Sequence, residues 1–157
     1  MSSVPRQPRA LPPRAPNTGT LLLEAYRAFE VELFAALAAA GHGGLRPKHG
    51  AVLANVGPEG SRLTDLAADA RMTKPSMKEL VDELASLGLV ERRPDSGDGR
   101  SRRIVLTRAG AEVVRVARRT IERIEEGYRD RLGTRVYASL RSALTALAGG
   151  RPSRESP

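Results

Sequence analysis

The sequence predicts a mainly α-helical fold with a small β-wing, in a single folded domain. Apolar residues recur at intervals of three or four along successive segments, and two short β-prone segments flank a polar, Gly-bearing loop. Gly and Pro mark most boundaries between these segments. Because residues 1–16 are rich in Pro and Arg, they are expected to form a disordered basic tail, and residues 149–157 a second tail. The folded domain is therefore expected over residues 17–148.

The first two helices are placed by their end signals. A long helix is expected over residues 18–40, because Asn17 or Thr18 has the side chain that caps a helix. A second helix is expected to open at Pro47, where the missing N–H is harmless, and to stop at Gly57.

The middle of the chain predicts two helices joined by a short turn. Residues 62–63 form a very short extended segment that leads into a helix capped by Thr64. After a tight turn at residues 71–72, Thr73 is expected to cap a further helix over residues 73–87. Two helices in this arrangement are typical of a helix-turn-helix.

A β-hairpin and two more helices complete the pattern. Residues 89–93 and 102–106 are expected to pair as strands around a polar loop at residues 95–99. Thr107 is expected to cap a long helix that Gly133 breaks, and a last helix follows.

The resulting order is α-α-β-α-α-β-β-α-α, which is that of a winged helix-turn-helix. The winged core is expected at residues 47–108, with the helix at residues 73–87 in the major groove of DNA and a wing at residues 92–106 on the minor groove. The helices at residues 18–40 and 107–148 carry more apolar surface than a monomer covers, so we expect them to form a dimerisation region.

Charge and composition point to an anionic partner and exclude several classes of protein. Lys and Arg number 26 against 18 Asp and Glu, a net charge of +8, and the stretch from Arg92 to Arg108 is the strongest basic cluster. With no Cys and two His, thiol chemistry and a multi-histidine metal site are not expected. No nucleophile–base pair or phosphate loop is visible, so we expect no enzyme activity and no cofactor. Charges interrupt the most apolar stretch, residues 21–40, so we expect a cytoplasmic protein with no membrane partner.

Several motifs in sequence resemble a known family. They are RLTDLA at residues 62–67, LVDEL at 80–84, LGLVER at 87–92, and DGR at 98–100 followed by VLT at 105–107 and Gly110. In type and spacing they resemble the MarR family of bacterial dimeric winged-helix regulators, over about residues 18–148. The resemblance implies a homodimer that binds pseudo-palindromic double-stranded DNA, usually as a repressor. In many members a small phenolic or anionic molecule releases the DNA.

Candidate DNA contacts lie at the start of the helix at residues 73–87, because the N-terminal turns of a recognition helix enter the groove. These are Thr73, Lys74, Pro75, Ser76 and Lys78. Lys78 has the chemistry to donate to guanine, and the alternative for this face is plain solvation. The acidic Glu79 departs from the family pattern: its carboxylate has the chemistry to accept from cytosine N4, or to pair with Lys78 or a nearby arginine, and the choice stays open. Asp82 and Glu83 are expected to orient or neutralise nearby arginines.

The wing supplies the remaining DNA candidates. Family resemblance assigns Arg100 to the minor groove at the wing tip, and Asp98 is expected to hold an arginine in position. Arg102 and Arg103 are also candidates, but they alternate sides of a strand, so only one of them is expected to face DNA well.

An effector site is expected between the first and second helices. Its candidate residues are Tyr26, Phe29, Arg46, His49 and Val52. A lone His is often a structural residue, and that alternative stays open for His49. The sequence therefore predicts a DNA-binding transcriptional repressor released by a small aromatic or anionic molecule. The alternative is a constitutive or architectural DNA-binding protein of the same fold without ligand control.

Overall fold

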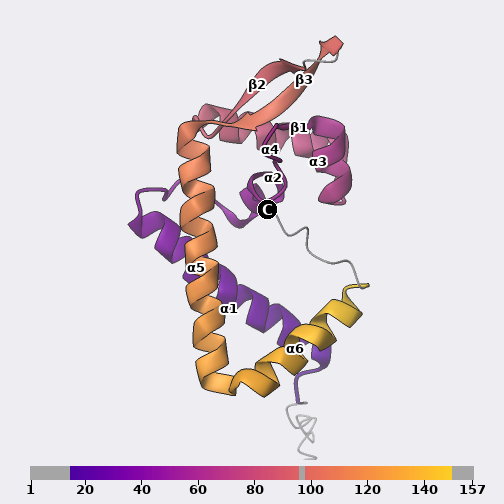
Figure 1. Ribbon diagram of the computed structural model, residues 1–157. Helices are drawn as coiled ribbons and strands as arrows, with labels where there is room; N and C mark the ends of the chain where they lie inside the picture. The colour runs from indigo at the N-terminus through magenta and orange to yellow at the C-terminus, as the bar shows by residue number, and fades with distance from the viewer. Residues whose placement is uncertain (1–14, 96–97, 150–157) are drawn as a thin grey trace, which may run out of the picture.

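The computed structural model describes residues 15–95 and 98–149, with the side chains of residues 98–101 outside the description. Its elements follow the predicted order, and the mainly helical fold with a small wing is confirmed (Figure 1). Their bounds are α1 Thr18–Ala39, the 3-10 turn η1 Pro47–His49, α2 Gly50–Leu53, β1 Ser61–Arg62, α3 Leu63–Asp69, α4 Lys74–Ser86, β2 Val90–Asp95, β3 Asp98–Leu106, α5 Arg108–Leu132 and α6 Thr134–Leu147.

Side-chain caps start three of the helices where the sequence predicts them. Asn17 accepts a hydrogen bond from the Thr20 amide at the start of α1. Thr73 accepts from the Ser76 amide at the start of α4, and Thr107 from the Gly110 amide at the start of α5.

The predicted cap at Thr64 is wrong. Helix α3 begins one residue earlier, at Leu63, and its N-cap is Arg62, which makes no side-chain capping bond. The reason is that β1 pairs with β3 and runs directly into α3, so the last strand residue occupies the cap position.

The wing is a three-stranded antiparallel sheet in the order β1-β3-β2. Its strands are longer than predicted, because Asp95 pairs with Asp98 and the expected polar loop at residues 95–99 is largely absorbed into the strands. A register shift between Pro94 and Asp95 accommodates the extra residues of β3. The second helix is also shorter than predicted, since α2 ends at Leu53.

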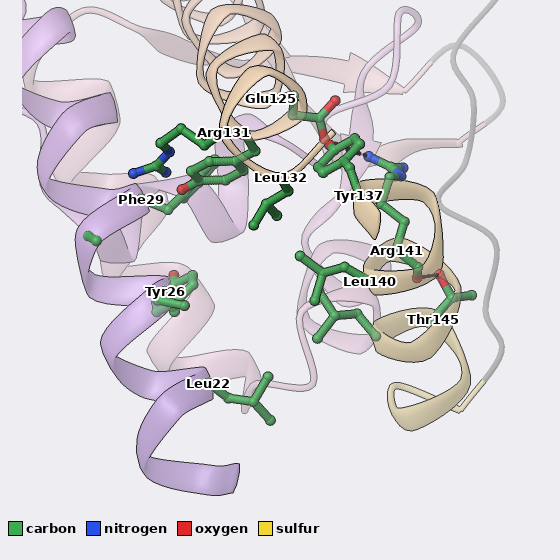
Figure 2. A pocket seen from close by; sticks show the side chains of 14 residues that line it. Leu22, Tyr26, Phe29, Glu125, Arg131, Leu132, Tyr137, Leu140, Arg141 and Thr145 are labelled. Carbon is green, nitrogen blue, oxygen red and sulfur yellow. Dashed lines mark hydrogen bonds and ion pairs between the residues drawn. The ribbon is translucent and has the colours of Figure 1, made fainter. Parts of the chain in front are cut away.

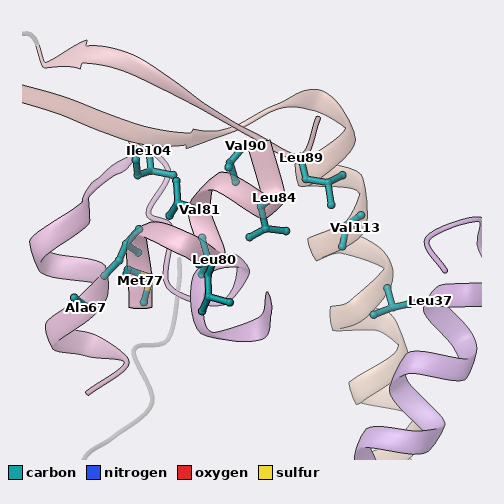
Figure 3. Packing of buried hydrophobic residues seen from close by; sticks show 12 residues of the cluster. Leu37, Ala67, Met77, Leu80, Val81, Leu84, Leu89, Val90, Ile104 and Val113 are labelled. Atoms are coloured by element: carbon teal, nitrogen blue, oxygen red, sulfur yellow. The ribbon is translucent and has the colours of Figure 1, made fainter. Parts of the chain in front are cut away.

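The core lies beneath α4 (Figure 3). Helix α4 buries the face predicted from its i, i+3, i+4, i+7 spacing, namely Met77, Leu80, Val81 and Leu84, each at most 5% exposed. These side chains pack with residues of α3, the wing strands and the first half of α5. The apolar packing therefore holds α4 firmly while leaving its opposite face in solvent.

The half of the molecule that contains α1, α6 and the end of α5 leaves large apolar side chains in solvent. Helix α5 runs from the wing to α6, and α1 crosses it (Figure 1). Large apolar side chains of α1, α5 and α6 remain exposed on this half: Leu21, Leu22, Leu23, Tyr26, Val31, Leu132, Val136, Leu140, Leu144 and Leu147. In the described part of the chain, no helix is long and apolar enough to cross a membrane.

Candidate nucleic-acid interface

The first turns of α4 present a polar and basic surface. Four of the candidate side chains are exposed: Thr73, Lys74, Pro75 and Lys78. Ser76 is partly buried, and its hydroxyl accepts a hydrogen bond from the Thr73 hydroxyl at 2.9 Å. Lys74 makes no ion pair with any residue in the described part of the chain. The structure thus brings together all five candidates that the sequence places on this helix.

Asp82 connects α4 to the wing. Its Oδ2 accepts a hydrogen bond from the Lys78 ammonium at 2.7 Å, and its Oδ1 accepts one from Arg92 of β2 at 2.6 Å. The hydrogen bonds from Lys78 and then from Arg92 hold the pKa of Asp82 below its usual value, so this carboxyl stays ionised. The expectation that Asp82 orients an arginine is confirmed, and its hold on Lys78 is an addition to it.

A buried carboxylate at the end of β2 links the three strands of the wing. The side chain of Asp95 is 3% exposed, and its Oδ2 accepts from Arg62 Nε and Nη2 at 2.9 and 2.7 Å. Its Oδ1 accepts from Arg103 Nε at 3.0 Å, and Arg103 Nη1 also donates to the Gly60 carbonyl at 3.0 Å. Because Asp95 is desolvated, these charge-assisted bonds fix both arginines at the junction of the three strands.

The wing candidates therefore differ in their availability. Arg103 is held by Asp95, whereas Arg102 is exposed and makes no ion pair with the described residues. Asp95 thus binds arginine in the way that the sequence predicts for Asp98. The side chains of Asp98 and Arg100 lie outside the described part of the structure. The alternation of Arg102 and Arg103 along one strand accounts for this difference.

A second polar contact ties α4 to the turn at η1. His49 is 2% exposed; its Nδ1 accepts from the Arg46 amide at 3.1 Å, so its ring proton lies on Nε2 and points to Glu83 at 2.9 Å. Glu83 also accepts a hydrogen bond from the Lys48 ammonium at 2.5 Å. The hydrogen bonds from Lys48 and then from His49 lower the pKa of Glu83 to about 2. Glu83 thus binds a lysine and a histidine instead of the expected arginine. The sequence carries no local signal of this contact because 34 residues separate His49 from Glu83.

The five candidate effector residues do not form one pocket. Tyr26 and Phe29 line a cavity of about 670 Å³ between α1, α5 and α6, which we call the distal cavity. Figure 2 shows Leu22 and Tyr26 on one side of it and Leu140 of α6 on the other.

Arg46 and His49 line a different cavity, of about 540 Å³, between α1, α2 and α5, which we call the proximal cavity. Val52 is fully buried in the core and lines neither cavity. The five residues do not share one cavity because α1 rises about 1.5 Å per residue, so its two halves face different neighbours. Leu33, Phe34 and Leu37 of α1 reach the proximal cavity instead.

Among the described residues, no group of His, Asp and Glu side chains is arranged to hold a metal ion. The polar side chains that do converge, around Asp82, Asp95 and Glu83, are engaged in ion pairs with Arg, Lys or His. The arrangement places exposed cations on one face of a rigid helix and on the adjacent wing, which suits contact with a polyanion.

Comparisons with known proteins agree with this geometry. A family model described as MarR family matches residues 43–101. An HTH-type transcriptional regulator of Mycobacterium leprae (strain TN) is 41% identical over 54 residues, which cover 34% of this chain and 38% of that protein. The match therefore spans well under half the length of this curated relative.

Solved structures match over most of the chain. CouR from Rhodococcus jostii RHA1 bound to p-coumaroyl-CoA gives a TM-score of 0.66 at 26% identity, covering 85% of this chain and 93% of that chain. The transcriptional repressor CouR bound to a 23-mer DNA duplex gives 0.67 at 25% identity, covering 84% and 92%. A MarR family model thus matches the winged core at residues 43–101, and the fold of the described chain is similar to those of solved transcriptional regulators.

Proposed function

We propose that the protein is a homodimeric transcriptional regulator that binds pseudo-palindromic double-stranded DNA in a sequence-specific manner. The observation that carries the proposal is the set of exposed cations on α4 and the wing: Lys74 and Lys78 on α4, Arg92, which Asp82 joins to Lys78, and Arg102. In a winged helix-turn-helix these residues meet the major groove through α4 and the adjacent backbone or minor groove through the wing. The proposal involves no catalytic step and no cofactor, and it places the protein with chromosomal DNA in the cytoplasm.

Dimerisation is supported by the apolar side chains that α1, α5 and α6 leave in solvent. Leu140, Leu144 and Leu147 of α6 are 39–70% exposed, and the distal cavity lies open beside them. Burying such surface against a second copy is favourable at about 25 cal/mol per Å². A two-fold axis between the copies sets the two recognition helices about 34–36 Å apart, one turn of DNA.

The test is DNase footprinting on the DNA that flanks the protein's own gene, together with selection from a random duplex pool. We expect protection of two inverted half-sites whose centres lie about 10 base pairs apart, or a multiple of one DNA turn. Equal binding to selected and scrambled duplexes would show that the protein is no sequence-specific regulator.

Repression controlled by a small aromatic or anionic molecule is the second part of the proposal. The proximal cavity is lined mainly by apolar side chains of α1, α2 and α5, and its exposed charged residues are Arg46, Arg118 and Glu122. An apolar cavity with a few cationic groups fits such a ligand. The relative CouR was solved with p-coumaroyl-CoA, which is an aromatic, anionic molecule of this kind.

A thermal-shift panel of benzoate, p-coumarate and p-coumaroyl-CoA tests this part. A ligand that binds only the folded state raises Tm by an amount that grows with the logarithm of its concentration above Kd, and an effector must also weaken DNA binding. A panel that changes neither Tm nor DNA affinity favours the alternative, a constitutive or architectural DNA-binding protein of the same fold.

A further inference from the structure

Both carboxylate oxygens of Asp82 are occupied by cations that the proposed function assigns to the DNA-binding face. Lys78, one helical turn earlier, holds Oδ2, and Arg92 of β2 holds Oδ1. The three side chains remain 64%, 44% and 36% exposed for Lys78, Asp82 and Arg92. DNA therefore has direct access to the cluster.

Stability does not account for this arrangement. Ion pairs with this degree of exposure contribute little to folding, because water screens them and ordering the side chains costs entropy. The same weakness lets a better partner displace the carboxylate. The cluster is thus suited to exchange its cations with a ligand instead of holding the fold together.

Phosphates and bases compete differently for the two cations. Non-specific DNA attracts lysine and arginine through its phosphates alone, and the strength of that binding follows the number of phosphates neutralised. A phosphate that approaches Lys78 or Arg92 also approaches the Asp82 carboxylate, which repels it. A guanine edge carries no net charge and offers two acceptors, so Lys78 gains a base contact with less opposition from Asp82.

Resting on the proposed DNA-binding function, we infer that Asp82 is a specificity-determining residue: it withholds Lys78 and Arg92 from the phosphates of non-specific DNA and leaves Lys78 available to a base. The other acidic residue on this side of α4 does not share the role. Glu79 is exposed and makes no ion pair within the described part of the chain. It therefore provides a matched comparison, with the same charge on the same helix.

The experiment compares Asp82→Asn with Glu79→Gln in the full-length protein. Fluorescence anisotropy measures the affinity for a duplex selected by the wild type and for a scrambled duplex of equal length, between 50 and 300 mM salt. For Asp82→Asn we expect tighter binding to the scrambled duplex and a salt slope steeper by about 1–2 per protomer, because up to two more phosphates are neutralised. The ratio of selected to scrambled affinity should fall at least about fivefold.

Glu79→Gln removes the same charge without freeing a cation, so it should change both affinities together and keep their ratio. If Asp82→Asn and Glu79→Gln change the ratio equally, or if Asp82→Asn leaves the ratio and slope as in the wild type, the inference is overturned. A wild-type protein that does not distinguish the two duplexes contradicts the proposed function itself, which is a separate outcome.

A pair of lysine variants tests the same idea without altering Asp82. Lys74 has no ion-pair partner in the described part of the chain, whereas Lys78 is held by Asp82. On the scrambled duplex, Lys74→Gln should reduce the salt slope by about 0.9 per protomer, and Lys78→Gln by clearly less. Equal reductions would show that Asp82 does not restrain Lys78, and circular dichroism melts confirm that each variant is folded.

Discussion

Gly110 in the first turn of α5 determines how closely this helix approaches the strand that begins the wing. A Cβ atom at this position would lie 1.9 Å from the Leu89 carbonyl oxygen and 2.9 Å from its carbon. The Leu89 carbonyl is fixed, because it accepts the Thr107 amide at 3.0 Å, and Thr107 Oγ1 donates to the Gly88 carbonyl at 2.6 Å. Neither partner of the contact is a flexible side chain. Gly110→Ala therefore forces backbone atoms apart by at least about 1 Å.

The expected cost follows from three contributions. Overpacking of this kind costs roughly 1–3 kcal/mol. Loss of the hydrogen bond between Thr107 and Leu89 adds about 1 kcal/mol. The better helix propensity of Ala returns about 0.5–1 kcal/mol. We expect Gly110→Ala to lower the free energy of unfolding by about 1–3.5 kcal/mol and Tm by about 4–14 °C.

Thermal melts followed by circular dichroism measure this effect, with Gly127→Ala as the control. Gly127 lies in the same helix, but a Cβ there would meet nothing within 4 Å. Gly127→Ala should therefore raise stability by about 0.5–1 kcal/mol through helix propensity alone. A Gly110→Ala protein that melts at or above the wild-type Tm would refute the reasoning from close approach.

Three further predictions concern the polar contacts and the dimer. Hydrogen bonds from Lys48 first and then from His49 lower the pKa of Glu83 to about 2. The contribution of Glu83 to stability is therefore complete above the unfolded-state pKa near 4.5 and is lost as pH falls toward 2. In urea titrations the difference between wild type and Glu83→Gln should thus shrink between pH 5 and pH 2, and a constant difference would contradict it. Asp95→Ala should cost about 1–3 kcal/mol in the same assay, because it removes the charge-assisted hydrogen bonds that join Arg62 and Arg103 to the end of β2, and no loss would count against that role. Leu140→Glu should give a monomer in light scattering where the wild type is a dimer, and a dimeric variant would argue for a different interface.

The parts of the fold that were predicted correctly depend on short-range patterns. Met77, Leu80, Val81 and Leu84 are buried as their spacing predicts, because residues three and four apart share one face of a helix. Thr73 caps α4 as predicted for the same reason, since a cap acts on amides only two or three residues away. Such regularities need no knowledge of the rest of the chain.

The predictions that failed depend on longer distances. Thr64 has a capping side chain, but pairing of β1 with β3 moves the cap position to Arg62. The wing strands extend further than expected because cross-strand pairing reaches Asp95 and Asp98. In both cases a contact with a distant strand overrides a local preference.

The candidate site divides in the same way. The basic residues of α4 were predicted from their position at the start of a helix, and the structure places them together on its exposed face. The partners of those residues were harder to predict. The sequence indicated that Asp82 would contact an arginine, but it did not indicate that Asp82 also binds Lys78. The sequence does not decide whether Arg102 or Arg103 is free of ion pairs. In the structure, Asp95 binds Arg103.

The sequence by itself therefore determined the order of the elements, the buried face of α4 and the basic character of its exposed face. These properties follow from periodicity, capping and charge, all of which act between near neighbours in the chain. Only the tertiary structure decided that Glu83 joins His49, that Asp95 joins Arg62 and that α1 serves two separate cavities. Those contacts join residues more than thirty positions apart or depend on how helices cross, and packing of the whole chain selects them.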